Sequence, residues 1–98
     1  MATKKNNKYQ VTLQETELKD GTAPNQSITF DIENHDNLME IISISKDRSW
    51  FENNRQNIEF IVGLKLLGEV AIRNRKNPLF EEFLPALGEL VKKIKDTN

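Results

Sequence analysis

The stretch from Ile58 to Ile72, IEFIVGLKLLGEVAI, decides the fold because it is the densest apolar run in the chain. At about 100° per residue, its apolar side chains cover most of the circumference of a helix. Charged side chains at helical spacing leave one polar strip, formed by Lys65, Glu69, Arg73 and Lys76. We therefore predict a largely buried middle helix with Leu67 in its core. Gly63 and Gly68 weaken a helix relative to alanine, so we interpret them as packing glycines beside another backbone.

Two strands are predicted before this helix. Apolar residues alternate with polar ones at Tyr9, Val11 and Leu13, and again at Ile28, Phe30 and Ile32. Such alternation is typical of strands with one face in water, which antiparallel sheets tolerate. The loop over residues 18–26 contains Asp20-Gly21, a turn-forming pair, so the strands form a hairpin. Because a lone hairpin is marginal in water, its apolar face must pack on the helices or its edge must pair with another chain.

Two further helices flank the middle one. A short helix follows the second strand, with Asp36 or Asn34 as its N-cap. The middle helix begins within residues 50–57, and Asn77-Pro78 separates it from the last helix, since proline suits the first helical position. Pro85 interrupts the last segment, so we expect a kink or a short helix abutting a longer one.

The resulting fold class is α+β, an N-terminal two-stranded antiparallel β-hairpin followed by three helices (ββααα). We predict a disordered tail over residues 1–7, which lack a large apolar side chain, and a single domain over residues 8–96. No cysteine is present, and no apolar run follows the basic start of the chain. We therefore expect a cytoplasmic protein with no membrane partner and no signal peptide.

Three sequence motifs occur in a distinctive order. They are Asn34-His35-Asp36, Val62–Glu69 (VGLKLLGE) and Asn77-Pro78-Leu79-Phe80. In this order they resemble the bacterial family catalogued as domain of unknown function 3861, over nearly the whole chain from Tyr9 to Lys95. The part from Gly63 to Glu69 is the most specific. The resemblance implies a fold and a bacterial origin but no activity.

His35 and Asp36 are the one histidine–carboxylate pair of neighbours in the sequence. Adjacent helical residues do not face each other, so we favour capping and local hydrogen bonding over a catalytic pair. The alternative is a small-anion or ligand site, because backbone N–H groups at a helix start attract anions. One histidine and dispersed acids do not make a metal site, and we expect no cofactor and no catalytic residues.

Trp50 and Phe51 are large aromatic residues in a connection, where such side chains either anchor an interface or cover the ends of helices. Both interpretations remain open at this point. Arg73, Arg75 and Lys76, together with lysines near both ends of the chain, provide a second candidate surface for a regulatory nucleic-acid binder. The formal net charge of −1 argues against nucleic acid as the main partner.

The leading functional hypothesis is a non-enzymatic protein-interaction module. The apolar middle helix and the two open edges of the hairpin both predict self-association as a homodimer. An unidentified bacterial protein is the further partner that we expect.

Overall fold

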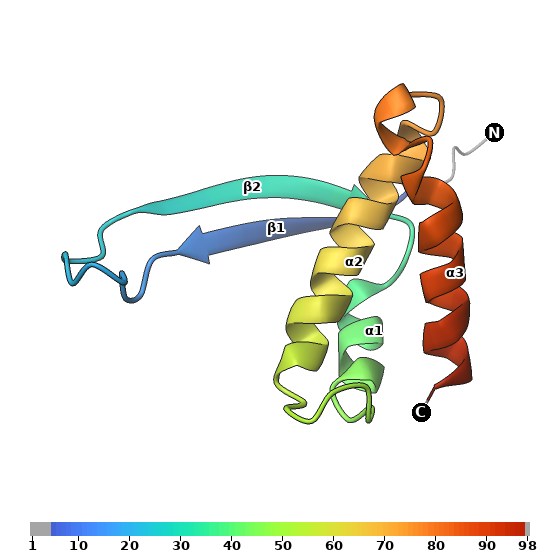
Figure 1. The fold of residues 1–98 in the computed structure, drawn as a ribbon. Helices are drawn as coiled ribbons and strands as arrows, with labels where there is room; N and C mark the ends of the chain where they lie inside the picture. The colour runs from blue at the N-terminus through green and yellow to red at the C-terminus, as the bar shows by residue number, and fades with distance from the viewer. Residues whose placement is uncertain (1–4, 98) are drawn as a thin grey trace. The chain divides into compact units, whose positions relative to one another are not determined.

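The computed structural model describes residues 5–97, in the order β1 (Asn7–Gln14), β2 (Ser27–Asn34), α1 (Leu38–Ser45), α2 (Gln56–Arg73), the 3-10 helix η1 (Pro78–Phe80) and α3 (Phe83–Asp96) (Figure 1). This order confirms the predicted α+β fold of two antiparallel strands followed by three helices. The chain divides into two compact units at His35 and Asp36. We call them the hairpin unit and the helical unit.

The first strand begins earlier than predicted. Asn7, which we assigned to the disordered tail, pairs with Asn34 at the start of β1. Residues 1–4 of the predicted tail lie outside the described part of the chain.

The hairpin unit has one apolar and one polar face. Opposite residues in the antiparallel register share a face, and the apolar pairs are Tyr9 with Ile32, Val11 with Phe30, and Leu13 with Ile28. On the other face, the hydroxyl oxygens of Thr12 and Thr29 lie 3.0 Å apart across the strands. The predicted alternation is therefore confirmed, and it segregates apolar side chains onto one surface.

The loop between the strands is held by its own hydrogen bonds. A carboxylate oxygen of Glu15 accepts from the backbone N–H groups of Asn25 (3.1 Å) and Gln26 (2.9 Å). Gly21 has φ = +82°, a conformation that favours glycine, and its N–H donates to the carbonyl of Leu18 at 3.0 Å. The predicted turn at Asp20-Gly21 is thus confirmed.

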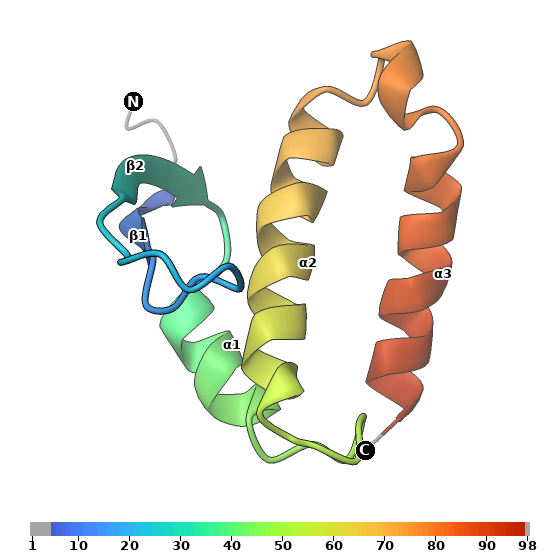
Figure 2. The ribbon, with the colours of Figure 1, turned by 60° about the vertical axis from the view of Figure 1, so that its left-hand side comes forward.

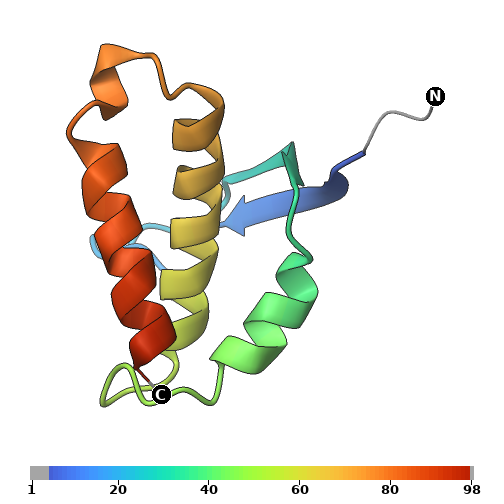
Figure 3. The same ribbon diagram turned by 90° about the vertical axis from the view of Figure 1, so that its right-hand side faces the viewer.

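The helical unit is built around α2. Figures 2 and 3 show α1 and α3 on opposite sides of α2, with α3 running antiparallel to it. The buried apolar side chains of the described residues come from all three helices and are Leu38, Ile61, Ala71 and Leu87. Each helix therefore contributes one apolar stripe to a small shared core.

The structure does not confirm that α2 is largely buried. Its buried positions, Asn57, Ile61, Gly68 and Ala71, form one stripe. Leu67 is 47% exposed, so our expectation that it lies in the core is wrong. Within the helical unit the helices α1 and α3 pack on α2, and two neighbouring helices can cover only part of a helix circumference.

The two glycines of α2 differ from each other. A methyl group added at Gly68 would lie 3.7 Å from Cδ2 of Leu87, so this glycine marks the contact of α2 with α3. The neighbour is a side chain rather than the backbone that we expected. Gly63 is exposed and has nothing within 4 Å of such a methyl group, so its interpretation as a packing glycine is wrong.

The helix ends confirm some of the predicted signals and correct one. The N-cap of α1 is Asn37 rather than Asp36 or Asn34, and its side-chain oxygen accepts from the N–H of Glu40 at 3.1 Å. Asn77 caps η1, and Pro78 follows in its first turn, as predicted. Pro85 lies in the first turn of α3, where its missing N–H costs no intrahelical hydrogen bond, so a short helix does abut a longer one.

Asn57 connects α1 to α2 from a fully buried position. Its side-chain amide nitrogen donates to the carbonyl of Ser45 at 2.9 Å and to the carbonyl of Arg48 at 2.7 Å. These carbonyls lie at the end of α1 and just beyond it, where carbonyl groups have no intrahelical N–H donor. The side chain of α2 thereby fixes both the end of α1 and the loop that follows it.

Ile61 and Leu67 allow a matched test of the burial pattern on one helix. Ile61, at 4% exposure, leaves a cavity when shortened, so Ile61→Ala should lower the free energy of unfolding by about 2–5 kcal/mol. Leu67→Ala should lower it by less than about 1 kcal/mol, because the side chain is already half in water. Urea titration followed by circular dichroism measures both, and equal losses would contradict the pattern.

Asn57→Ala should lower the free energy of unfolding by about 2 kcal/mol, because one buried and one partly buried carbonyl lose their donor. Asn57→Asp should cost more, since a carboxylate cannot donate to either carbonyl. Asn53→Ala is the control, because the exposed Asn53 side chain only accepts from the N–H of Arg55. A loss below about 0.5 kcal/mol for Asn57→Ala in urea titration would show that the amide does not hold the connection.

Candidate functional site

The apolar face of the hairpin unit is open at the end that carries the loop. Leu13 is 69% exposed, Ile28 58% and Phe30 41%. A hollow of about 460 Å³ lies at this end, lined by Leu13 and Ile28 together with Gln14, Glu15, Gln26 and Ser27. Scattered exposed apolar residues are ordinary on proteins, but three large ones on adjacent pairs of one face form a patch. We call Leu13, Ile28 and Phe30 the hairpin patch.

The helical unit carries a groove of about 300 Å³. Its floor consists of aliphatic side chains from the three helices, namely Ile41, Ile44, Ile61, Leu64, Val91 and Ile94. Three cationic residues, Arg48, Lys65 and Lys95, also line it, together with Ser45 and Trp50. An apolar floor with positive charges beside it suits a ligand that is apolar and acidic.

Lys65 and Asp36 form an ion pair within the helical unit. The Lys65 ammonium nitrogen lies 2.9 Å from a carboxylate oxygen of Asp36, and both side chains are partly exposed. Lys65, in the polar strip of α2, thus reaches the residue before the α1 cap. A pair at this exposure contributes at most about 1 kcal/mol, so its main effect is on the position of the two side chains.

Trp50 and Phe51 both pack on Phe60 of α2. The ring centroids lie 5.7 Å and 5.3 Å from that of Phe60, with edge-to-face geometry in both cases. The Trp50 indole N–H also donates to the carbonyl of Thr97 at 3.3 Å, and Figure 3 shows the end of the chain beside this loop. Of the two open interpretations, Trp50 covers the ends of two helices, while Phe51 remains 37% exposed.

His35 and Asp36 lie between β2 and α1. His35 is exposed after the end of β2, and Asp36 forms its ion pair with Lys65. Neither residue lines the groove or the hairpin hollow. Over residues 5–97, no cluster of three or more histidine, aspartate or glutamate side chains could hold a metal ion. The anion-site alternative at His35 stays a prediction.

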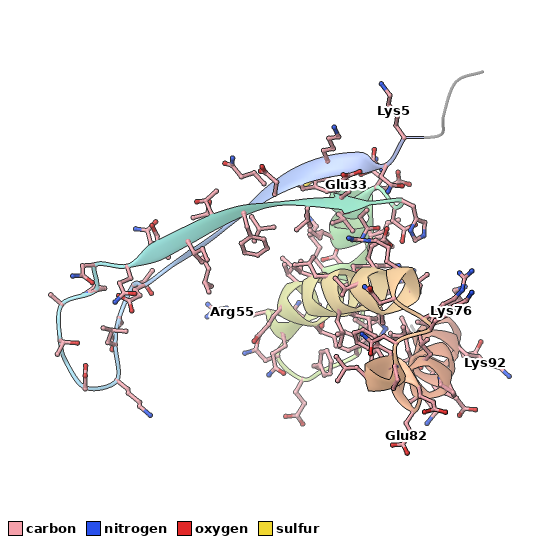
Figure 4. All side chains as sticks on the ribbon, turned by 90° about the horizontal axis from the view of Figure 1, so that it is seen from above. Lys5, Glu33, Arg55, Lys76, Glu82 and Lys92 are labelled. Carbon is pink, nitrogen blue, oxygen red and sulfur yellow. The ribbon has the colours of Figure 1, made fainter. Side chains whose placement is uncertain are left out.

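Arg73 ends α2, and Arg75 and Lys76 follow it as exposed residues. Figure 4 shows Lys76 and Lys92 projecting on the same side of the helical unit, whereas Arg55 projects from the opposite side. Lys92, Lys93 and Lys95 all belong to α3, so part of the predicted basic surface lies on one unit. Nucleic-acid binding by this surface stays a prediction.

Sequence reasoning missed two features of the helical unit. Asn57 was treated as part of a helix start, although its buried side chain joins α1 to α2. The lining cations of the groove come from the connection after α1, from α2 and from α3, so no local motif indicates them. The spacing of Val91 and Ile94 in the last helix is the signal that could have indicated one wall of the groove.

Searching the part of the chain that the structure describes, we find no helix long and apolar enough to cross a membrane.

Comparison with curated proteins finds no match. Among solved structures, the chain resembles a protein of unknown function from Pectobacterium atrosepticum, whose crystal structure was determined at 2.20 Å resolution. The two share 30% sequence identity and superpose with a TM-score of 0.77, covering 94% of this chain and 99% of the other. The model of the family described as "Domain of Unknown Function with solved-structure structure (DUF3861)" matches residues 7–96. The match spans the hairpin and all three helices, and the chain therefore belongs to the DUF3861 family.

Proposed function

We propose that the protein is a non-enzymatic interaction module of the bacterial cytoplasm that self-associates as a homodimer. The observation that carries the proposal is the hairpin patch, in which Leu13, Ile28 and Phe30 are all more than 40% exposed on one face. Removing such surface from water contributes about 25 cal/mol per Å² of apolar area. A second chain is the partner that is present wherever the protein is made.

The architecture of the hairpin supports this proposal. The sheet of the described residues has two strands, so β1 and β2 each have an outer edge with no neighbouring strand. Two-stranded sheets need packing on one face or further strands to be stable in water. A two-fold partner supplies one self-complementary contact, which is why closed dimers are the commonest oligomers.

The structural use of the acidic side chains supports a non-enzymatic role. Asp36 pairs with Lys65, and Glu15 accepts two backbone hydrogen bonds within the loop. The N–H of Thr22, and then its hydroxyl group, lower the pKa of Asp20 by donating to its carboxylate. The lowered pKa of Asp20 reflects hydrogen bonds that stabilise the turn at Asp20-Gly21.

Ile28→Asn should weaken the dimer, and Thr29→Asn is the matched control on the polar face of the same strand. Burying an isoleucine contributes about 1.5–3 kcal/mol, so Ile28→Asn should raise the dimer dissociation constant about tenfold or more. Light scattering coupled to size exclusion, with sedimentation equilibrium for the constants, measures the effect.

The wild-type protein should have twice the chain mass of 11.3 kDa in that experiment. A mass that stays at 11.3 kDa up to high micromolar concentration would rule out self-association. Circular dichroism of both variants checks that the fold is retained.

A further inference from the structure

We propose that the helical groove of one chain receives the loop end of the hairpin of a second chain, each chain both giving and receiving a hairpin. The inference rests on the proposed self-association and adds the two surfaces that meet. On one side is the hairpin patch of Leu13, Ile28 and Phe30. On the other side is the groove between α1 and α3.

The two surfaces match in apolar character. The hairpin patch offers aliphatic and aromatic side chains that protrude from a face, and the groove offers six aliphatic side chains that form a floor. The groove volume of about 300 Å³ is at the lower end of the range for small-ligand pockets. It therefore has room for a few side chains of a narrow element, such as the end of a hairpin, rather than for a large surface.

The two surfaces also match in charge. Residues 13–28 contain three acids, Glu15, Glu17 and Asp20, against one base, Lys19. The groove is lined by Arg48, Lys65 and Lys95 and by no carboxylate. Opposite charges beside an apolar contact steer association and fix its register. Lys65 already binds Asp36, so the exposed Lys95 on α3 is the cation best placed to meet an incoming acid.

The length of the strands favours a second copy as the occupant. Six residues separate Ile28 from Asn34, the end of β2, which corresponds to about 20 Å of extended chain. The loop end of the hairpin patch is thus separated from the end of β2 by most of the length of the strand. Exchange of one identical element between two chains is a low-cost route to a closed dimer, because both contacts form at once.

Charge reversal tests the contact. Lys95→Glu and Glu17→Lys should each raise the dimer dissociation constant about tenfold at low salt, and the double variant should recover most of the loss. The matched controls reverse charges on the same elements away from the contact. Lys92→Glu changes α3 at a residue that does not line the groove, and Asp31→Lys changes the polar face of β2. Both controls should leave the constant within about twofold of the wild type.

Disulfide trapping gives a second measurement that does not depend on charge. The chain has no cysteine, so a Glu17→Cys variant and a Lys95→Cys variant can be mixed and oxidised. A disulfide-linked pair of the two variants is expected, and Lys92→Cys in place of Lys95→Cys should give far less.

The outcomes separate the two proposals. A wild-type dimer that tolerates Lys95→Glu and Glu17→Lys and gives no mixed disulfide would overturn the groove contact while leaving self-association intact. A wild-type chain that is monomeric at all concentrations would overturn both.

Discussion

The buried amide of Asn57 is the constraint on which the geometry of the helical unit depends. Its two hydrogen bonds reach the carbonyls of Ser45 and Arg48, so one side chain of α2 sets where α1 ends and how the next residues turn. Arg48 and Trp50 lie in that segment, and both line the groove. Among the atoms that the structure describes, the amide oxygen of Asn57 has no hydrogen-bond partner. The two hydrogen bonds that the amide donates satisfy carbonyls at and beyond the end of α1, where intrahelical donors are lacking.

The same connection links the groove to the end of the chain. Trp50 packs edge-on against Phe60 and donates to the carbonyl of Thr97 after α3. The loop is thereby fastened to α2 through a ring contact and to α3 through a hydrogen bond. Arg48 and Trp50, which line the groove, both belong to the connection between α1 and α2.

Patterns with a local physical cause were predictable from the sequence. Alternation at Tyr9, Val11 and Leu13 indicated the strands, and Pro78 and Pro85 marked a short helix abutting a longer one, because φ and hydrogen-bond constraints act within a few residues. The cap of α1 was predicted at Asp36 or Asn34, whereas Asn37 is the cap, because Asp and Asn have similar capping chemistry and the sequence does not show that Asp36 pairs with Lys65.

Features that depend on the number of neighbours were not predictable in this way. The apolar run of α2 predicted burial on several sides. A hydrophobic pattern shows which faces of a helix can be buried, but it does not show whether other elements cover those faces. Within the helical unit, α1 and α3 leave Leu67 half exposed. The same holds for the hairpin. The alternation of apolar and polar residues correctly identified its apolar face, but it did not show whether that face is covered. Both elements keep large apolar side chains exposed, and the self-association that we propose is one physical means of removing them from water.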